Sequence, residues 1–232
     1  MQEALTVYRN EKKYYLSPIE SVRLQEEMQI LLEPDEFSKQ GSYHVRSLYF
    51  DTLNNRDFTE KGEGVRIRRK IRLRIYDTED QKVKFEIKAK NGAYQHKSSL
   101  IVSREDAMAI QEGDYGILLD YDNETALRLY AMLTLNCYRP VSLIEYDRRA
   151  FIYPENNTRI TFDSNVKSSE MELDLFEKEV PWISLPEDTC ILEVKYDHQL
   201  FKPISMILEK YHLNNVSFGK YANGRPVMES YI

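Results

Sequence analysis

The sequence lacks several features that would place it in a common class of protein. It has no run of 18 apolar residues, so we expect no membrane-spanning helix. Residues 1–16 contain no apolar segment typical of a secretory signal, and we expect a cytoplasmic protein. The two cysteines, Cys137 and Cys190, form no C-x-x-C pair, which fits a reducing compartment and predicts two core thiols. Because the 232 residues include only 8 glycines and 8 prolines, we expect no long linker and predict one domain over residues 1–232.

Several familiar site motifs are also absent. The chain has neither a G-x-x-x-x-G-K-[ST] loop nor a G-x-G-x-x-G turn, so a glycine-rich loop is not expected to hold phosphate. It has no G-x-S-x-G motif of a serine hydrolase. The four histidines lack the H-x-x-x-H spacing and, with two isolated cysteines, predict no zinc site; they are His44, His96, His198 and His212.

Positive charge is concentrated in one segment of an acidic chain. The formal net charge is −6, yet residues 61–100 contain 12 Lys or Arg and 5 Asp or Glu, a local charge of +7. Residues 1–60 sum to −4 and residues 101–232 to −9. A general nucleic-acid binder is more often basic overall. The distribution therefore favours an anion bound at one place and disfavours a nucleic-acid partner.

The pattern of apolar residues predicts a mixture of antiparallel strands and helices. Ser17, Pro18 and Glu20 form a capping box with proline at the first helical position, so a helix is expected over 18–32, with Ile19, Val22 and Met28 on its apolar side. Residues 54–64 and the C-terminal tail are expected to be irregular. Further helices are predicted at 103–112, 123–135 and 200–212, and strands at 7–16, 43–52, 65–76, 82–90, 94–102, 141–153, 158–163, 169–176 and 190–197. This order indicates an α+β barrel or sandwich.

The charged residues of two predicted strands lie on one face of each. Side chains alternate along a strand, so residues 65–76 place five cations on one face: Arg66, Arg68, Lys70, Arg72 and Arg74. Residues 82–90 likewise align Lys82, Lys84, Glu86, Lys88 and Lys90. A solvated polar face is the simpler interpretation of any one strand. Rows of cations, however, need a compensating anion, and the planar fork of arginine suits phosphate.

Three glutamates interrupt the cations. Glu11, Glu86 and Glu193 each precede a lysine by two residues and so share its face. Carboxylates would repel phosphate, but they could hold Mg²⁺ or Mn²⁺, which then bridges phosphate oxygens. Alternatively, each glutamate only neutralises its neighbouring lysine. The residues themselves leave both interpretations open.

A series of short motifs follows the chain in order: R-x-E-x-K-Y (9–14), SLYFDT (47–52), KIRLRIY (70–76), FEIKAK (85–90), YDRRAF (146–151), RITFD (159–163), ILEVKYD (191–197) and SFGKYANG (217–224). With these motifs the sequence resembles the VTC domain, the polyphosphate polymerase domain of the vacuolar transporter chaperone complex and its bacterial relatives, within the triphosphate tunnel metalloenzymes. The resemblance implies a closed antiparallel β-barrel that forms a tunnel, with helices packed outside.

The resemblance also implies an activity and a site. The γ-phosphate of ATP would be transferred to a polyphosphate chain, and a Mn²⁺ or Mg²⁺ ion would be held by Glu193 together with Glu11. Arg72, Arg74, Lys88, Arg148 and Lys195 would contact the reacting phosphates. Further phosphate contacts would come from Arg9, Lys13, Lys97 and Lys220.

Two features of the resemblance leave alternatives open. Arg9 stands where the wider superfamily carries the first glutamate of E-x-E-x-K, which favours a polymerase, but Gly219 replaces the serine of the family's F-S-K-Y motif. A triphosphatase on the same fold, which hydrolyses inorganic or organic triphosphate, and a non-catalytic module that binds polyphosphate or nucleotide, remain alternatives. Pyrophosphate is expected as a further ligand. Coupling to a membrane would need a separate partner protein in trans.

Overall fold

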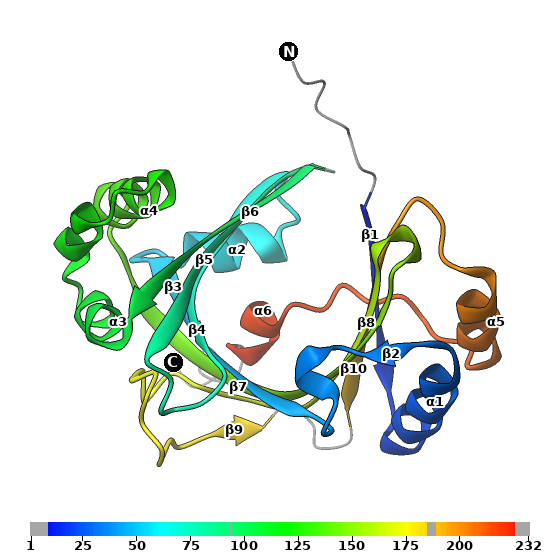
Figure 1. The fold of residues 1–232 in the computed structure, drawn as a ribbon. Coiled ribbons are helices and arrows are strands. Elements are labelled where there is room, and N and C mark those ends of the chain that lie inside the picture. Colours follow the sequence, from blue (N-terminus) through cyan, green and yellow to red (C-terminus); the bar gives the residue numbers. More distant parts are fainter. Residues whose placement is uncertain (1–8, 93, 185–188, 226–232) are drawn as a thin grey trace. The chain divides into compact units, whose positions relative to one another are not determined.

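Helices are interspersed among strands along the computed structural model, which describes residues 9–92, 94–184 and 189–225 (Figure 1). The strands are β1 (Arg9–Leu16), β2 (Glu33–Pro34), β3 (Tyr43–Thr52), β4 (Ile67–Ile75), β5 (Lys82–Asn91), β6 (Tyr94–Ser103), β7 (Tyr138–Tyr153), β8 (Thr158–Ser169), β9 (Ile183–Ser184) and β10 (Cys190–Asp197). The α-helices are α1 (Pro18–Leu31), α2 (Arg56–Gly62), α3 (Arg104–Gln111), α4 (Glu124–Leu135), α5 (Lys202–Lys210) and α6 (Lys220–Gly224). Three 3₁₀ segments are η1 (Glu36–Ser38), η2 (Tyr115–Asp120) and η3 (Glu155–Asn157). Within the described ranges, no helix is long and apolar enough to cross a membrane.

The elements belong to two compact units, each assembled from three segments of the chain. The first unit combines Met1–His44, Tyr146–Val166 and Ser184–Phe218, and the second combines Val45–Glu145, Lys167–Ile183 and Gly219–Ile232. The strands β3, β7, β8 and β9 contribute residues to both units. The single domain expected over residues 1–232 stays a prediction.

In the first unit, the antiparallel strands β1, β10 and β8 are paired in that order. One face of these strands packs against α1 and α5 in a core that contains Tyr14, Leu16, Leu24, Met28, Phe162, Leu192, Val194, Ile204 and Leu208. Because strand side chains alternate, Glu11, Lys13 and Glu193 lie on the opposite face. The helices therefore cover the apolar face of this sheet.

The predicted capping of α1 is confirmed, but its predicted apolar side is partly wrong. The Ser17 hydroxyl accepts a hydrogen bond from the Glu20 backbone N–H, and the Glu20 carboxylate accepts one from the Ser17 backbone N–H. Met28 is buried as expected, whereas Ile19 and Val22 are 65% and 57% exposed. The helix is anchored by residues 21, 24 and 28, which share one face at the helical spacing of three and four.

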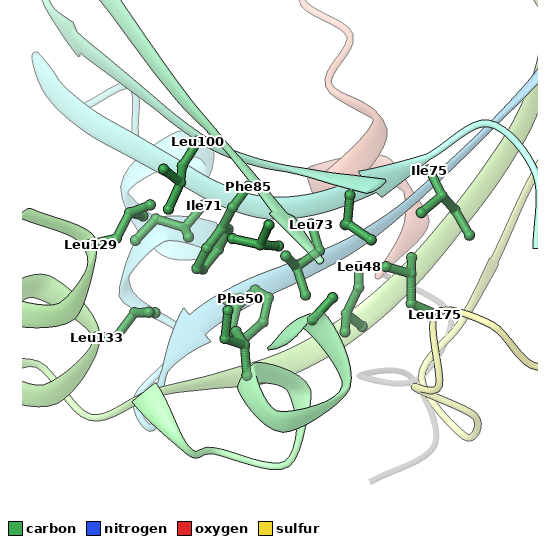
Figure 2. Close-up of a cluster of buried hydrophobic side chains, with 14 of the residues drawn as sticks. Leu48, Phe50, Ile71, Leu73, Ile75, Phe85, Leu100, Leu129, Leu133 and Leu175 are labelled. Carbon is green, nitrogen blue, oxygen red and sulfur yellow. The ribbon is translucent and has the colours of Figure 1, made fainter. Parts of the chain in front are cut away.

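In the second unit, β3, β4, β5 and β6 are paired antiparallel in that order. Figure 2 shows Leu48 and Phe50 of β3, Ile71, Leu73 and Ile75 of β4, and Phe85 of β5 in one core. Val83 and Ile87 of β5 belong to the same core. The same core receives Ala107 and Ile110 of α3, Leu118 of η2, and Ala126, Leu129 and Leu133 of α4. The alternation predicted for β4 and β5 is therefore confirmed from Ile71 to Ile75 and from Val83 to Ile87, where helices cover the apolar face and the cations lie on the other face. At the start of β4 it is not, because Ile67 is 54% exposed.

Four local expectations are corrected. Residues 56–62 form α2, because the Asp51 carboxylate accepts hydrogen bonds from the backbone N–H groups of Asp57 and Phe58 and so caps the helix from a distant strand. The predicted strand at 169–176 is not formed: after β8 ends at Ser169, its hydroxyl accepts from two backbone N–H groups, a local alternative to strand pairing. Within the expected irregular tail, α6 is formed. Cys190 is buried as predicted, but Cys137 is exposed.

The fold is an antiparallel α+β fold, as the sequence predicts. The pairing order of the described strands starts at β1, ends at β6 and does not return to its first strand. Closure of the sheet into a barrel therefore stays a prediction. Residues 7 and 8 of the first predicted strand lie outside the described residues.

Candidate functional site

The polar face of the second unit carries rows of cations, one of which continues across three strands. Residues directly opposite one another in antiparallel strands point to the same side. Lys70 of β4 is opposite Lys88 of β5, which is opposite Lys97 of β6. In the neighbouring rows Arg68 is opposite Lys90, and Arg74 is opposite Lys84. Like charges directly opposite one another destabilise a sheet. A bound anion would reduce the electrostatic repulsion between these cations.

Glu86 is the carboxylate within these three strands that faces the same side. It lies opposite Arg72, whose Nε and Nη2 are each 2.7 Å from Glu86 Oε2. Arg74 Nε is 3.7 Å from the same oxygen, and the exposed Lys97 pairs with Oε1. Burial by itself raises the pKa of Glu86, but Arg72, Arg74 and Lys97 outweigh burial and lower the pKa to about 2. The carboxylate is therefore a fixed negative charge that orients the two arginines, and its oxygens are shared among cations.

Tyr49 joins this cationic face from β3. It lies opposite Arg72, and its phenol oxygen accepts a hydrogen bond from Arg72 Nη1 at 2.9 Å. Burial raises the pKa of Tyr49, but Arg72, Lys70 and Arg74 outweigh burial and lower it to about 8. The lowered pKa of the Tyr49 phenol indicates a positive electrostatic potential at this face. The sequence analysis did not single out Tyr49, although alternation in SLYFDT separates it from the apolar Leu48 and Phe50.

The segment that contains Lys220 is anchored beside Tyr49. The ring of Tyr221 stacks on Tyr49, with ring centroids 5.2 Å apart and an interplanar angle of 12°. The Tyr221 hydroxyl donates to the buried Asp51 and accepts from Arg225 Nη1 at 3.0 Å. This places Lys220, the first residue of α6, in the second unit with Arg72, Arg74, Lys88 and Lys97.

Gly219 stands at the start of this anchored segment. Its backbone is extended, and a side-chain Cβ at this position would meet Lys70 Nζ and Lys61 Cε, both at 3.4 Å. These are ordinary van der Waals distances, so the position has room for the serine that the family motif carries. Steric exclusion therefore does not explain why glycine replaces serine at position 219. The replacement removes a hydroxyl group from a position beside Lys70.

The polar face of the first unit combines cations with carboxylates. Glu11 is opposite Lys195, and Lys13 is opposite Glu193, in the pairing of β1 with β10. Lys13 Nζ is 3.1 Å from Glu11 Oε1 and 3.2 Å from Glu193 Oε2, while Lys195 pairs with the other Glu193 oxygen. Burial lowers the pKa of Lys13, but Glu193 and Glu11 outweigh burial and raise it, so the ammonium stays charged. The two predicted metal ligands are thus brought together around one lysine.

Arg148 lies in the first unit and is held by a buried carboxylate. Its Nε and Nη2 donate to the two oxygens of Asp163 at 2.7 and 2.8 Å, and Asp163 is fully buried. Burial lowers the pKa of Arg148, but Asp163, Tyr146 and Glu193 outweigh burial and raise it well above its ordinary value. The bidentate pair fixes the plane of the guanidinium. The sequence analysis selected Arg148 but did not identify Asp163 as its partner.

Thr161 adds a polar group that the sequence analysis did not select. It lies on β8 directly opposite Glu193, is 2% exposed, and its hydroxyl has no hydrogen-bond partner among the described residues. In the same strand, Arg159 lies opposite Lys195 and its Nη2 contacts Asp35 at 2.7 Å. Arg9 lies opposite Asp197 in the register of β1. Parity in RITFD was the available signal for both Arg159 and Thr161.

The predicted residues therefore fall into two sets. The second unit contains Arg72, Arg74, Lys88, Lys97 and Lys220, and the first contains Arg9, Glu11, Lys13, Arg148, Glu193 and Lys195. Across the described residues, no group of three or more His, Cys, Asp or Glu side chains is placed to hold a metal ion by itself.

Comparison with known proteins agrees with these features. Two solved structures are similar in fold at 12% sequence identity: a candidate adenylate cyclase from Bacillus halodurans (TM-score 0.51, covering 91% of this chain and 95% of that one) and a candidate adenylyl cyclase from Hippeastrum described as having a dominant triphosphatase activity (TM-score 0.56, covering 93% and 94%). No curated protein matches the chain significantly. A family model described as the VTC domain matches residues 8–229, nearly the whole chain. The chain therefore belongs to the VTC domain family, as the resemblance of its sequence implies.

Proposed function

We propose that the protein is a metal-dependent polyphosphate polymerase, which transfers the γ-phosphate of ATP to the end of a polyphosphate chain. The row of Lys70, Lys88 and Lys97 across three strands carries this proposal. Three lysines at directly opposed strand positions, of which Lys97 shares Glu86 with two arginines, are compensated best by a ligand with several linked negative charges. A triphosphate or a polyphosphate chain has this chemistry.

The cationic face of the second unit would bind and neutralise the phosphates. Arg72 and Arg74 are oriented by Glu86 and present planar N–H donors, whereas Lys88, Lys97 and Lys220 supply point charges. In phosphoryl transfer the bond between the γ-phosphorus and its bridging oxygen breaks, and an oxygen of the terminal phosphate of the chain forms the new bond while ADP leaves. The protein contributes mainly positioning and charge neutralisation to such a reaction.

The polar face of the first unit would take part in the same reaction through Glu11 and Glu193. Their donor chemistry fits Mg²⁺ or Mn²⁺, because such ions are commonly held by one or two carboxylates and complete their coordination with water and phosphate oxygens. The unpartnered Thr161 hydroxyl opposite Glu193 is a further oxygen that fits such a site. When bound, the cation would neutralise charge on phosphate oxygens. Lys13, Lys195, Arg9 and the fixed guanidinium of Arg148 would add positive charge.

A triphosphatase is the second candidate. It would use the same groups, with water in place of the terminal phosphate as acceptor, and the triphosphatase activity described for the Hippeastrum protein favours it. A module that binds polyphosphate, nucleotide or pyrophosphate without turnover is the third. If the protein acts with a membrane, a separate partner protein in trans would provide the link.

One incubation separates these functions. Purified protein is mixed with ATP and Mn²⁺, and the products are resolved by size. Long phosphate polymer with ADP supports the polymerase. Orthophosphate without polymer would support the triphosphatase, and binding of ATP without any turnover would reject both enzymes. A chelator in a parallel reaction tests the need for the cation.

A further inference from the structure

The Lys13 ammonium occupies the position where the two candidate metal ligands meet. Its nitrogen is 3.1 Å from Glu11 Oε1, 3.2 Å from Glu193 Oε2 and 3.2 Å from the carbonyl oxygen of Phe218. An ammonium group has three donors and no acceptor. All three donors of Lys13 therefore have an oxygen acceptor, so in this arrangement the side chain is committed to the protein and is not presented to phosphate.

The backbone of Lys13 is held independently of its side chain. Its N–H donates to the side-chain oxygen of Asn215 at 3.2 Å, and its carbonyl oxygen accepts from the Val216 N–H at 2.8 Å. Strand pairing with Glu193 fixes the residue further. The four-carbon stem can rotate while the backbone stays in place. Movement of the ammonium therefore requires no rearrangement of β1.

We propose that Lys13 is a tethered counterion that competes with a divalent cation for Glu11 and Glu193, so that binding of the cation releases Lys13 toward phosphate. The inference rests on the proposed function, because it takes these two glutamates as the ligands. Oxygen ligands lie about 2.1 Å from Mg²⁺, much closer than the oxygens lie to the Lys13 nitrogen. A cation between the same two oxygens would draw them into the space of the ammonium, and the two positive charges would repel each other.

Lys195 provides the contrast within the same cluster. It pairs with Glu193 through the other carboxylate oxygen, Oε1, and lies opposite Glu11 in the strand register. A cation that bridges Glu11 Oε1 and Glu193 Oε2 would displace Lys13 and leave the contact of Lys195 in place. The mechanism therefore predicts unequal effects for two lysines of equal charge, whereas general electrostatic repulsion predicts similar effects.

The test measures Mn²⁺ binding by electron paramagnetic resonance without any phosphate present. Lys13→Met is expected to tighten Mn²⁺ binding about tenfold, because a competitor that occupies the ligands nine times in ten weakens the apparent affinity by that factor. Lys195→Met is expected to change it less. Lys12→Met, an exposed lysine on the same strand, is expected to leave it within about twofold and controls for net charge. Thermal unfolding of each variant checks that it is folded.

A second measurement examines the released lysine. Tripolyphosphate affinity, measured by calorimetry, is expected to fall in Lys13→Met when Mg²⁺ is present and to be unchanged when Mg²⁺ is absent. An equal loss under both conditions would overturn the inference, as would equal effects of Lys13→Met and Lys195→Met on Mn²⁺ binding. If neither the native protein nor Lys13→Met binds Mn²⁺, or if Glu193→Gln leaves Mn²⁺ binding unchanged, the proposed metal site itself is wrong.

Discussion

Replacement of Lys88 by alanine should change stability and phosphate binding in opposite directions. Lys88 faces Lys70 on one neighbouring strand and Lys97 on the other. A like-charged pair directly opposite in a sheet costs roughly 0.2–1 kcal/mol, so removing the central lysine is expected to raise the free energy of unfolding by about 1 kcal/mol in the ligand-free protein at low salt. The same change removes a charged donor worth about 1.5–3 kcal/mol, so tripolyphosphate affinity is expected to fall roughly ten- to a hundredfold.

The assays are urea unfolding without phosphate and calorimetric titration with tripolyphosphate, both at low salt because screening weakens both effects. Lys82→Ala is the matched control: it removes a lysine from the same face of β5, where the opposite residue on β6 is Ser103. The control should change neither quantity by more than about 0.5 kcal/mol. A less stable Lys88→Ala protein whose tripolyphosphate affinity equals that of the native protein would refute the interpretation of this face as an anion site.

Three further predictions concern the cationic face and its anchored segment. The cations of β4 outweigh burial and set the pKa of Tyr49 at about 8, so the tyrosinate absorbance that is lost in Tyr49→Phe should titrate near pH 8. The stability that ionisation of Tyr49 adds should be complete above the ordinary tyrosine pKa near 10 and lost as the pH falls through 8. Bound tripolyphosphate should move the titration toward pH 10, and a titration that does not change with tripolyphosphate would contradict the account. Tyr221→Phe removes the donor to the buried Asp51 and should lower the free energy of unfolding in urea by about 2 kcal/mol; a change below about 0.5 kcal/mol would show that the contact is not stabilising. Gly219→Ser should unfold within about 0.5 kcal/mol of the native protein, because its Cβ meets Lys70 only at 3.4 Å, and a larger loss would reveal a steric conflict.

The alternation of residues along strands predicted the central part of the fold correctly. In β4 and β5, parity separates apolar residues from cations, and the hairpin register places Arg72 opposite Glu86 on the charged face. The capping box at Ser17 also predicted the start of α1. These features depend on neighbouring residues in the sequence, so local patterns are sufficient to predict them.

Contacts between distant residues account for what the sequence did not predict. The helix α2 begins where Asp51 of β3 accepts hydrogen bonds from its backbone N–H groups. The residue at its N-cap makes no side-chain capping hydrogen bond, so the local sequence does not predict where the helix begins. Ile19 and Val22 are exposed because the packing of α1 is decided by the face that meets the core. The Arg148–Asp163 pair and the Tyr221–Asp51 contact likewise join separate segments. Such pairings follow from strand order and packing, which one sequence does not specify.

The position of the candidate ligands illustrates the same difference. Their spacing from Lys13 and Lys195 along each strand was visible in the sequence, but two interpretations were equally consistent with it: metal binding or neutralisation by lysine. The structure shows that Lys13 contacts Glu11 and Glu193 together. The Lys13 ammonium therefore neutralises both carboxylates. Whether a divalent cation competes with this ammonium can be measured.

The most direct test of the account is the turnover of ATP by Glu193→Gln at saturating Mn²⁺. This substitution keeps the size of the side chain and removes the charge that is proposed to hold the cation. We predict that turnover falls at least about a hundredfold at temperatures where thermal unfolding shows the variant to be folded, although loss of the partner of Lys13 and Lys195 lowers its unfolding temperature. Tripolyphosphate should still bind without metal, because the cations of the second unit are untouched. An unchanged rate at saturating metal would contradict the assignment of Glu193 and, with it, metal-assisted phosphoryl transfer at this site.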